Sequence, residues 1–414
     1  MVAGRTVRDL RHDSRFSLLR AIYASDTVSR QDLVNETGLS FATVSNLIKE
    51  LLAAGIILEA SREESNGGRP RALLRLATDR GLLVGVDASE TYIHVDVFDL
   101  AMHLVSRHQH AIAEDTTQPE QVMAEIARGV RTALRPHRGV DVLGVGVSLP
   151  GQVQPDVGVS LFAPNWGWQN VPAQQLLQRR LKRPVHVDNP LKAATVAELW
   201  FGHGRQVADL VTVNLGTGIG AGIAYEGRLM RGVSNNAGEW GHTLFVHDGR
   251  VCRCGRRGCL EAYIGFPGLM TQFAERYPGH RYLDTGSQTG FLRAFRQGLV
   301  RQDHEAIWLI DLFGDQLGSG LADLVNMINP RLIVLTSWAA LALQEWLVPR
   351  AKLRMQGEAI NGSVNLVDLV ITTVPENPVS TGMAALALEE FLDSIGLPSR
   401  SSRRALRDWV VPSA

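Results

Sequence analysis

The segment from Glu239 to Glu261, EWGHTLFVHDGRVCRCGRRGCLE, most constrains how this chain can fold, because it holds every cysteine of the 414 residues. Three thiols and a preceding imidazole are the ligand set of a closed tetrahedral zinc site. Gly255 and Gly258 lie between the thiols, where a tight turn requires glycine. The pattern therefore predicts a Zn²⁺ ion bound by His242, Cys252, Cys254 and Cys259.

Disulfide bonds and buried free thiols account for the cysteines less well than a metal does. A disulfide framework leaves one of three cysteines over, and Cys-x-Cys is a poor spacing for a bridge. Three buried free thiols would not need to be clustered, nor to enclose Gly and Arg residues. The spacing leaves the fourth ligand open between His242 and His247.

The first eighty residues have the pattern of a helix-turn-helix. Apolar residues predict a first helix at 16–24, Ser29 and Asp32 resemble the capping box of a second helix, and Gly38 ends it. A third helix follows, whose apolar residues recur at helical spacing and predict one buried face. Its start and opposite face carry residue types that contact base edges and phosphates in the major groove: Ser40, Phe41, Thr43, Ser45, Asn46 and Lys49.

A pair of strands, 56–59 and 73–76, is predicted next, around a Gly-rich loop at 61–72. Arg69 and Arg71 in this loop suit the narrow minor groove of DNA. Charge does not separate DNA binding from a solvated three-helix packing module, because residues 1–80 hold twelve Arg and Lys against ten Asp and Glu. The uninterrupted order of helix, turn, capped helix and basic loop favours DNA binding.

The remaining chain contains two similar beginnings. Residues 82–98 and 211–225 each predict a strand, a turn and a second strand, which indicates two similarly built α/β lobes. In the first lobe we expect helices at 120–134 and 192–201 and strands at 142–148 and 185–187; a final helix is expected at 381–392. Trp166 and Trp168 either stack on a sugar or, as loop tryptophans more often do, close a core.

Glu239, His242 and the run Cys-x-Cys-Gly-x-x-Gly-Cys-x-Glu that ends at Glu261 resemble the signature of the ROK family of bacterial sugar kinases and sugar-responsive repressors. The first segment, with Gly-Arg-Pro at 68–70, resembles the winged-helix domain of the repressor branch. The resemblance implies an α/β chain with a winged helix-turn-helix at 1–80 and a two-lobed actin-like (ribonuclease H-like) ATPase fold. Its lobes would be 81–198, onto which the helix at 378–396 packs back, and 199–377 with the zinc loop, before a tail at 397–414. It further implies sugar contacts from Asn189, Glu239, His242 and Glu261.

Departures from the kinase pattern predict that phosphoryl transfer is lost. The phosphate loop of the first lobe, Asp-x-Gly-Gly-Thr in the kinases, is Asp-Ala-Ser-Glu-Thr at 87–91 here. On the adenosine side, Asn-Pro should lead into a Gly-Gly turn, but residues 336–338 are Thr-Ser-Trp. Only the Gly-rich loop of the second lobe, at 216–222, keeps its glycines.

The residue that acts as catalytic base in the kinases is also missing from this sequence. In the kinases it is the Asp of an Asn-Asp pair before Ala-Glu, and alignment through Ala-Glu at 197–198 places Asn189 and Pro190 there. General-base catalysis contributes roughly two to four orders of magnitude, and proline cannot accept a proton. A register slip would bring in Asp188, although proline in a first helical turn favours a settled geometry. We therefore expect no enzyme activity; an ATP-dependent sugar kinase with a DNA-binding domain is the alternative.

Composition limits the partners. The formal net charge is +0, so DNA binding must depend on a local patch. The apolar run at 332–343 is too short to cross a bilayer, and the clustered thiols fit a reducing cytoplasm. We expect a cytoplasmic homodimer, or dimer of dimers, that binds operator DNA and a sugar or sugar-phosphate effector. The kinase base also contacts the hydroxyl that receives the phosphate. A pentose, which lacks that hydroxyl, or a sugar already phosphorylated there would therefore lose the least binding affinity when the base is missing.

Overall fold

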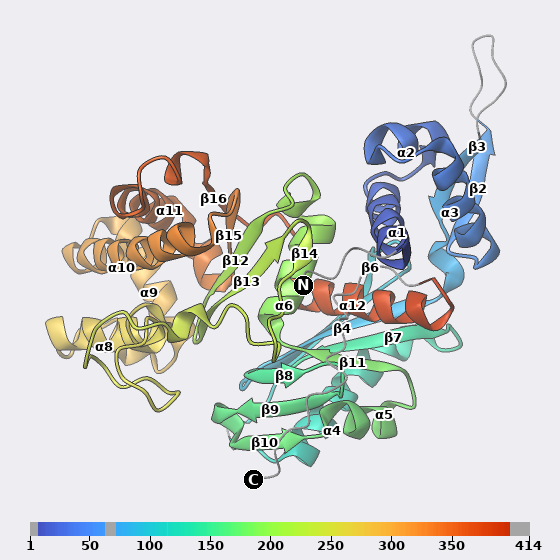
Figure 1. Ribbon diagram of the computed structural model, residues 1–414. Helices are drawn as coiled ribbons and strands as arrows, with labels where there is room; N and C mark the ends of the chain where they lie inside the picture. The colour runs from blue at the N-terminus through green and yellow to red at the C-terminus, as the bar shows by residue number, and fades with distance from the viewer. Residues whose placement is uncertain (1–6, 63–71, 114, 398–414) are drawn as a thin grey trace. The chain divides into compact units, whose positions relative to one another are not determined.

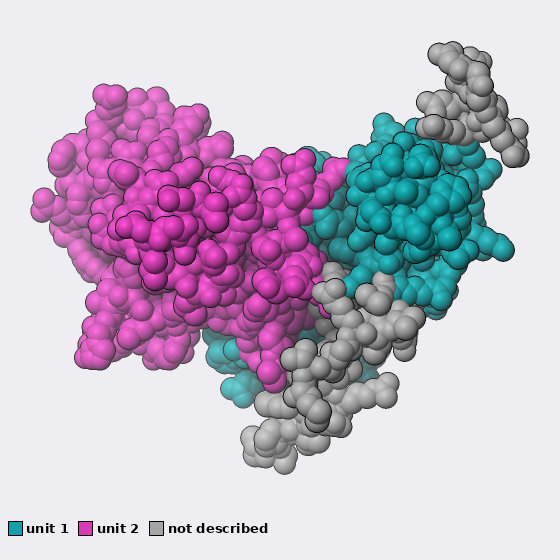
Figure 2. Space-filling view, turned by 45° about the horizontal axis from the view of Figure 1, so that its top comes forward, with its two compact units in different colours: residues 1–201, 375–414 teal, residues 202–374 magenta. Residues whose placement is uncertain are grey.

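The computed structural model of the chain describes residues 7–62, 72–113 and 115–397 (Figure 1). The chain divides into two compact units, coloured separately in Figure 2. Unit 1 comprises residues 1–201 and 375–414, and unit 2 comprises residues 202–374. Within the described ranges, no helix is both long enough and apolar enough to cross a membrane.

An N-terminal module of unit 1 contains three helices and a hairpin, in the order α1 (Val7–Tyr23), β1 (Val28–Ser29), α2 (Arg30–Thr37), α3 (Phe41–Ala53), β2 (Ile57–Arg62) and β3 (Ala72–Leu76). The strands form a small sheet in the order β1-β3-β2. The capping box is confirmed: Ser29 accepts from the backbone N–H of Asp32, whose carboxylate accepts from the N–H of Ser29. Gly38 ends α2 at a φ of 68°, a left-handed conformation that glycine adopts without strain.

Helix α1 is longer than the sequence pattern predicts, since it begins at Val7 rather than at Phe16. Its first two turns are mostly polar and lack the apolar spacing on which the prediction was based. Tertiary ion pairs support this extension, because Arg11 and Arg15 both contact the carboxylate of Glu50 on α3.

The remainder of unit 1 is built on a five-stranded sheet in the order β11-β7-β4-β5-β6. Strands β4 (Leu82–Ala88), β5 (Tyr92–Phe98) and β6 (Leu104–Ala111) are antiparallel neighbours, whereas β7 (Val142–Ser148) and β11 (Val185–Asp188) run parallel to β4. Helices α4 (Pro119–Leu134), α5 (Ala173–Leu181), α6 (Pro190–Phe201) and α12 (Pro378–Ser394) pack around this sheet and each other. A second, three-stranded sheet contains β8 (Gln152–Gln154), β9 (Val159–Ala163) and β10 (Trp168–Val171).

The final helix packs on the first lobe, as the family resemblance implies. Glycines of β4 and β7 permit this contact, because a Cβ added at Gly85 would lie 1.8 Å from the carbonyl oxygen of Ser380. A Cβ added at Gly146 would lie 2.0 Å from that of Met383. Helix α12 therefore approaches the sheet backbone more closely than side chains would allow.

Trp166 and Trp168 close a core. Their rings lie 4.4 Å apart, and they expose only 6% and 3% of their surfaces. The indole N–H of Trp168 donates to the carbonyl oxygen of Thr117 at 2.6 Å. Of the two alternatives, stacking of these rings on a sugar is wrong, because burial in unit 1 removes them from solvent.

Unit 2 repeats the plan of the first lobe. Its sheet has the order β14-β13-β12-β15-β16, from β12 (Leu210–Leu215), β13 (Ile219–Tyr225), β14 (Arg228–Leu229), β15 (Leu332–Thr336) and β16 (Asp368–Ile371). Again three antiparallel strands are followed by two parallel ones. The prediction of two similarly built α/β lobes is therefore confirmed.

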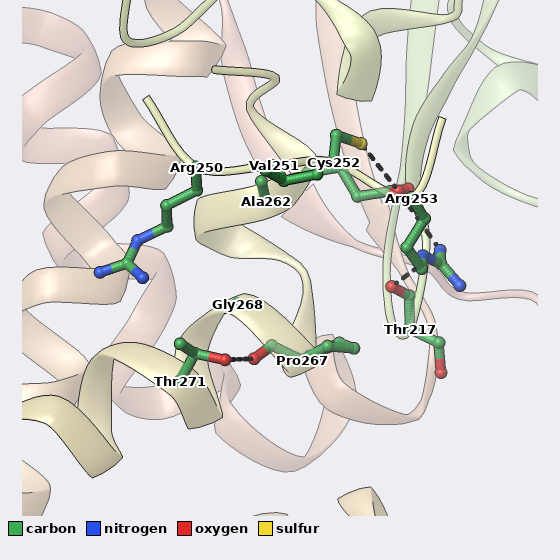
Figure 3. Close-up of a pocket in the computed structure, with 10 residues that line it drawn as sticks. Thr217, Arg250, Val251, Cys252, Arg253, Ala262, Pro267, Gly268 and Thr271 are labelled. Atoms are coloured by element: carbon green, nitrogen blue, oxygen red, sulfur yellow. Dashed lines mark hydrogen bonds and ion pairs between the residues drawn. The ribbon is translucent and has the colours of Figure 1, made fainter. Parts of the chain in front are cut away.

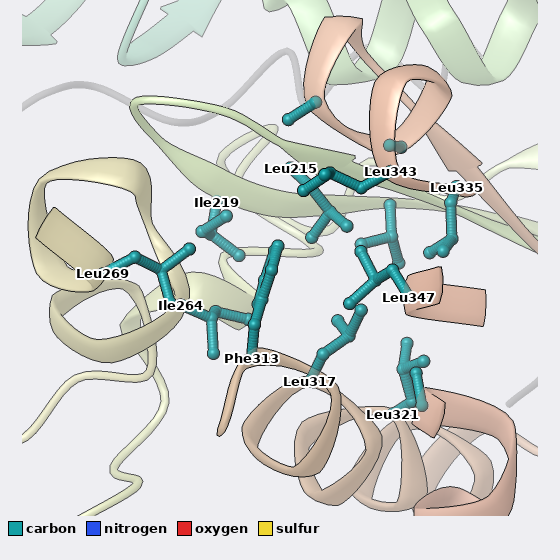
Figure 4. Close-up of a cluster of buried hydrophobic side chains, with 14 of the residues drawn as sticks. Leu215, Ile219, Ile264, Leu269, Phe313, Leu317, Leu321, Leu335, Leu343 and Leu347 are labelled. Carbon is teal, nitrogen blue, oxygen red and sulfur yellow. The ribbon is translucent and has the colours of Figure 1, made fainter. Parts of the chain in front are cut away.

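Helices provide the other half of the unit 2 core. They are α7 (Glu261–Ile264), α8 (Phe266–Arg276), α9 (Gln288–Arg301), α10 (His304–Ile328) and α11 (Trp338–Glu358). Figure 4 shows side chains of α10 and α11, among them Phe313, Leu317, Leu343 and Leu347, meeting Leu215 of β12. This apolar core supports the segment that carries the clustered cysteines, because Trp240 and Leu260 of that segment belong to it.

Candidate metal centre and binding surfaces

The four predicted ligands of the cysteine segment come together in unit 2. The ligand atoms of His242, Cys252, Cys254 and Cys259 all lie within 4.8 Å of one another. The Sγ atom of Cys252 lies 3.6 Å from Nδ1 of His242, and the Sγ atoms of Cys254 and Cys259 are 3.7 Å apart. Zn–S bonds of about 2.3 Å would place tetrahedral sulfur ligands about 3.8 Å apart, so the cluster fits zinc.

The geometry also answers the two questions that spacing left open. A disulfide has an S–S distance of about 2.05 Å, far below the observed separation, and all three cysteines are free. His247 is not part of the cluster: its side chain is 85% exposed and pairs with Asp248 at 3.0 Å. His242 is therefore the imidazole that faces the thiols.

Local backbone geometry explains why the thiols converge. Gly255 and Gly258 have φ values of 87° and 76°, which L side chains rarely adopt. A Cβ at Gly258 would in addition lie 1.9 Å from the carbonyl oxygen of Val246. The N–H of Cys252 donates to the carbonyl of Arg256 at 2.8 Å and closes the turn. The two glycines thus allow the chain to return on itself between the cysteines.

The imidazole is positioned by a buried tryptophan. His242 ends the short 3₁₀ helix Trp240–His242, and the indole N–H of Trp240 donates to the carbonyl oxygen of Gly320 on α10 at 3.1 Å. Glu239, at the start of the same short helix, is exposed to solvent. One anchored turn therefore presents both an expected sugar contact and a metal ligand.

Glu261, the first residue of α7, directly adjoins the cluster. One carboxylate oxygen accepts from the backbone N–H of Ile219 at 3.0 Å, and the other lies 3.7 Å from the Sγ atom of Cys252. Arg253 pairs with the carboxylate at 3.3 Å and donates to the carbonyl oxygen of Thr217 in the Gly-rich loop. These contacts connect the cluster, the Gly-rich loop and the carboxylate, which is 7% exposed.

A pocket of about 380 Å³ opens beside these residues (Figure 3). Its volume lies within the roughly 300–1,000 Å³ typical of small-molecule sites. Its lining comes from the cysteine segment, from the Gly-rich loop and from the start of α8, and includes Glu261, Cys252, Arg250, Arg253, Thr217 and Thr271. The pocket therefore combines charged side chains with apolar surface from Val251, Ala262 and Pro267.

Helix α3 presents the polar face expected of a DNA-reading helix. Val44, Leu47, Ile48 and Leu51 are buried, whereas Phe41, Asn46 and Lys49 are exposed and Ser45 is half-buried. Ser40 caps the helix by accepting from the N–H of Thr43 at 3.1 Å, and the two hydroxyls lie 2.9 Å apart. Both hydroxyls therefore already have roles in folding. Arg69 and Arg71 lie outside the described residues.

Comparisons with known proteins identify the family. The model of the ROK family matches residues 83–390. The chain belongs to the ROK family. The xylose repressor of Caldicellulosiruptor bescii is 29% identical over 92% of this chain and 97% of the relative. A ROK family transcriptional regulator, a homologue of the E. coli MLC protein, has the same fold, with a TM-score of 0.77 over 94% of this chain and 99% of that chain at 22% identity.

Kinases of the ROK family share the two lobes. A ROK family glucokinase from Streptomyces griseus, solved with glucose and AMPPNP, is 28% identical, with a TM-score of 0.65. It covers 74% of this chain and 99% of its own length. Likeness to the regulators therefore extends across the N-terminal module, whereas likeness to this kinase covers a smaller share of the chain.

The loop at 87–91, which ROK kinases keep open with glycines, is filled with side-chain hydrogen bonds here. Asp87 is buried and accepts from the hydroxyl of Tyr92 at 2.9 Å and from the amide of Asn377 at 3.1 Å. Burial raises the pKa of Asp87, although these hydrogen bonds act in the opposite direction. Glu90 accepts from the amide of Asn165 at 2.5 Å. The carboxylates are thus held by neighbouring side chains.

The turn at 336–338 keeps a glycine-like backbone without a glycine. Ser337 has φ 113° and ψ 164°, a combination found almost only in glycine. Its hydroxyl donates to the carbonyl oxygen of Leu215 and accepts from the N–H of Ala340. The next residue, Trp338, places its indole nitrogen 3.7 Å from where a Cβ of Gly216 would be. The indole ring of Trp338 therefore lies close to the Gly-rich loop.

We predict different effects on stability for two substitutions of Ser337. Ser337→Ala keeps the strained backbone but loses the helix cap and the bond to Leu215, and should lower the free energy of unfolding by about 1–2 kcal/mol. Ser337→Gly loses the same bonds but relieves strain of about 1–3 kcal/mol, and should remain close to the parent. Chemical denaturation of both variants measures the difference. Equal destabilisation would show that the serine is not strained.

The two residues that the sequence aligns with the kinase Asn-Asp pair lie at the start of α6. Pro190 is the first residue of α6, and Asn189 accepts from the N–H of Leu191 at 2.8 Å and donates to the carbonyl oxygen of Gly151 at 2.7 Å. Asp188, the residue that a register slip would bring in, is the last residue of β11. Asp188 is fully buried in β11, where it pairs with Ser148 of β7.

Proposed function

We propose that the chain is a cytoplasmic, sugar-responsive transcriptional regulator, most simply a repressor, that binds operator DNA and does not phosphorylate its effector. The observation that carries this proposal is one chain that joins a capped, solvent-facing helix α3 to ROK lobes whose kinase loops are filled. The likeness to a xylose repressor over 92% of the chain supports it. In this proposal residues 1–80 form the winged helix-turn-helix, 81–198 and 199–377 the lobes, and 397–414 a tail.

We propose zinc as the ion of the cysteine cluster. His242, Cys252, Cys254 and Cys259 would hold it, and the donor set and ligand spacing support a closed structural site. When bound, zinc supplies a cross-link between the 3₁₀ helix at 240–242 and the turn at 252–259. The residues themselves do the rest: Trp240 anchors the imidazole, and Cys252 lies against Glu261.

The effector is a sugar or sugar phosphate. Glu261, Glu239 and His242 of unit 2 and Asn189 of unit 1 are the proposed sugar contacts, since carboxylates accept hydrogen bonds from vicinal hydroxyls. Arg253 already engages Glu261, so a sugar hydroxyl would share the carboxylate with this guanidinium. The missing base at Pro190 makes a pentose, or a sugar phosphorylated at the acceptor hydroxyl, the favoured ligand. Equal affinity for glucose and xylose in calorimetry would argue against this preference.

DNA binding is assigned to the exposed side of α3, together with the two arginines of the sequence between β2 and β3. Phe41, Ser45, Asn46 and Lys49 would enter the major groove, with Ser40 and Thr43 positioning the start of the helix. Arg69 and Arg71 would reach the minor groove. A homodimer, or dimer of dimers, would bind a palindromic operator. The sugar changes DNA affinity only if it binds one arrangement of the protein better than the other.

A gel-shift experiment tests this function. The full chain is mixed with promoter DNA, or with duplexes selected from random sequence, and titrated with pentoses, hexoses and their phosphates. We expect one retarded protein–DNA complex, and we expect one class of sugar to dissociate it. Asn46→Ala should weaken the complex by roughly 5- to 150-fold, because an Asn–adenine contact contributes about 1–3 kcal/mol. No retarded complex with any duplex would contradict the proposal.

A kinase assay tests the alternative, a sugar kinase with an appended DNA-binding domain. We expect no sugar-dependent ADP formation above the rate without sugar, because a base, an open phosphate loop and an open adenosine turn are all missing. The Streptomyces griseus glucokinase serves as the positive control with glucose. Clear turnover of any sugar by the parent chain would establish the alternative.

A further inference from the structure

Phe41, the first residue of α3, has an unusual environment for a phenylalanine. It exposes 56% of its surface, more than any other phenylalanine among the described residues. Burial of such a side chain would contribute about 1.5–3 kcal/mol, and phenylalanine is only a modest helix former. Folding of the N-terminal module thus gains little from Phe41, although apolar positions of the same helix, such as Leu47, are buried.

The position of Phe41 relates it to the proposed DNA surface. It precedes Ser45 by one helical turn and is the first residue of α3, where its ring is mostly exposed although Val44 and Leu47 further along the helix are buried. The neighbouring hydroxyls of Ser40 and Thr43 are engaged in the helix cap. At the start of this helix, therefore, a mostly exposed aromatic ring lies beside two hydroxyls that are engaged in the cap.

We infer that Phe41 recognises the 5-methyl group of a thymine in the major groove of each operator half-site. The inference rests on the proposed DNA binding and adds to it a specific base. The first residues of a recognition helix contact base edges, and the thymine methyl is the apolar feature of the major groove that phenylalanine contacts. Cytosine lacks this methyl group, so the ring favours an A·T pair at that position. Ser45, Asn46 and Lys49 would read or position the neighbouring groups.

Uracil substitution tests this inference with the change of a single methyl group. Duplexes are selected from random sequence with the full parent chain, and each thymine of the best duplex is replaced in turn by uracil, which keeps the same hydrogen-bonding edge. For the parent, we expect affinity to fall roughly three- to fivefold at one thymine in each half-site, the effect of one buried methyl group. For Phe41→Ala, we expect weaker binding and no loss at that thymine.

A matched variant controls for the loss of an aromatic ring. Phe162 on β9 is also partly exposed, at 39%, and belongs to unit 1 but not to the N-terminal module. Phe162→Ala should keep the affinity and the uracil sensitivity of the parent. Thermal melting should change only slightly for Phe41→Ala, because more than half of its surface is already exposed to solvent.

Three outcomes contradict the inference. If the parent binds its duplex but no uracil weakens binding, Phe41 reads no methyl group and only this inference fails. If Phe41→Ala loses affinity at the same thymine as the parent, another side chain reads it. If the parent selects no duplex, DNA binding fails and the inference fails with it; a change in oligomeric state of Phe41→Ala would then assign the ring to a protein contact.

Discussion

Replacing Cys252 with serine should remove zinc from the chain and abolish the response to sugar. The parent is expected to contain about one zinc ion per chain, as a four-ligand structural site does. Cys252 contributes one ligand and also lies 3.7 Å from Glu261, so its loss disturbs both the metal and the proposed sugar contact. We expect the melting temperature to fall by roughly 10 °C and operator binding to become insensitive to sugar.

A histidine pair provides the control for this experiment. His242→Ala should reproduce the zinc loss, whereas His247→Ala should keep the zinc content of the parent, because His247 is 85% exposed and pairs with Asp248. Elemental analysis of the purified chains measures zinc independently of DNA binding. A zinc-free parent, or a Cys252→Ser variant that responds to sugar as the parent does, would contradict the role assigned to the cluster.

The second large effect is expected at Trp200, near the end of α6. Its ring is 1% exposed and packs edge-on against Phe16 and Tyr23 of α1, with ring centres 5.2 and 5.4 Å apart. The indole N–H donates to Glu389 of α12 at 3.3 Å. The chain passes into unit 2 immediately after Phe201. Trp200 therefore contacts the first helix of the N-terminal module and lies two residues before the start of unit 2 in the chain.

Trp200→Ala should both destabilise the protein and separate DNA binding from sugar sensing. Loss of a buried tryptophan costs about 3–5 kcal/mol in the free energy of unfolding. Below the melting temperature, we expect the variant to retain measurable operator affinity, while the ratio of affinities with and without sugar approaches about one. Thermal melting and operator titrations on the same sample measure the two effects.

Trp168→Ala controls for destabilisation alone. Trp168 is 3% exposed, belongs to unit 1 and has its indole N–H bonded to Thr117, but it contacts the core of β9 and β10 instead of α1. This variant should lose similar stability and keep the sugar response. If Trp200→Ala responds to sugar as strongly as the parent, the contact between α1 and α6 does not transmit the signal.

Local chemistry made much of the fold predictable. The capping box at Ser29, the glycine end at Gly38 and the serine cap at Ser40 each act within a few residues, so sequence alone defines α2 and α3. The convergence of His242 and the three cysteines was predictable for a similar reason. Thiols are rare in this chain, and the two turn glycines, Gly255 and Gly258, mark how they converge.

Contacts between distant segments were not predictable in the same way. The choice between His242 and His247 depends on the anchor that Trp240 makes with α10, which spacing does not reveal. The strained backbone of Ser337 arises because the turn places this serine in a conformation that glycine normally adopts. The contact between Arg253 and Glu261 likewise requires the folded cysteine turn. Such features arise from packing, and a single sequence contains no pattern for them.

Fluorescence anisotropy of a labelled operator, titrated with the zinc-replete chain in the presence and absence of each sugar, tests most directly whether this chain is a sugar sensor without kinase activity. No ATP is added. We predict that one class of pentose or sugar phosphate changes operator affinity by about 5- to 150-fold, the usual range of coupling between two sites. Identical affinities with every sugar, or a change that occurs only when ATP is consumed, would contradict this role.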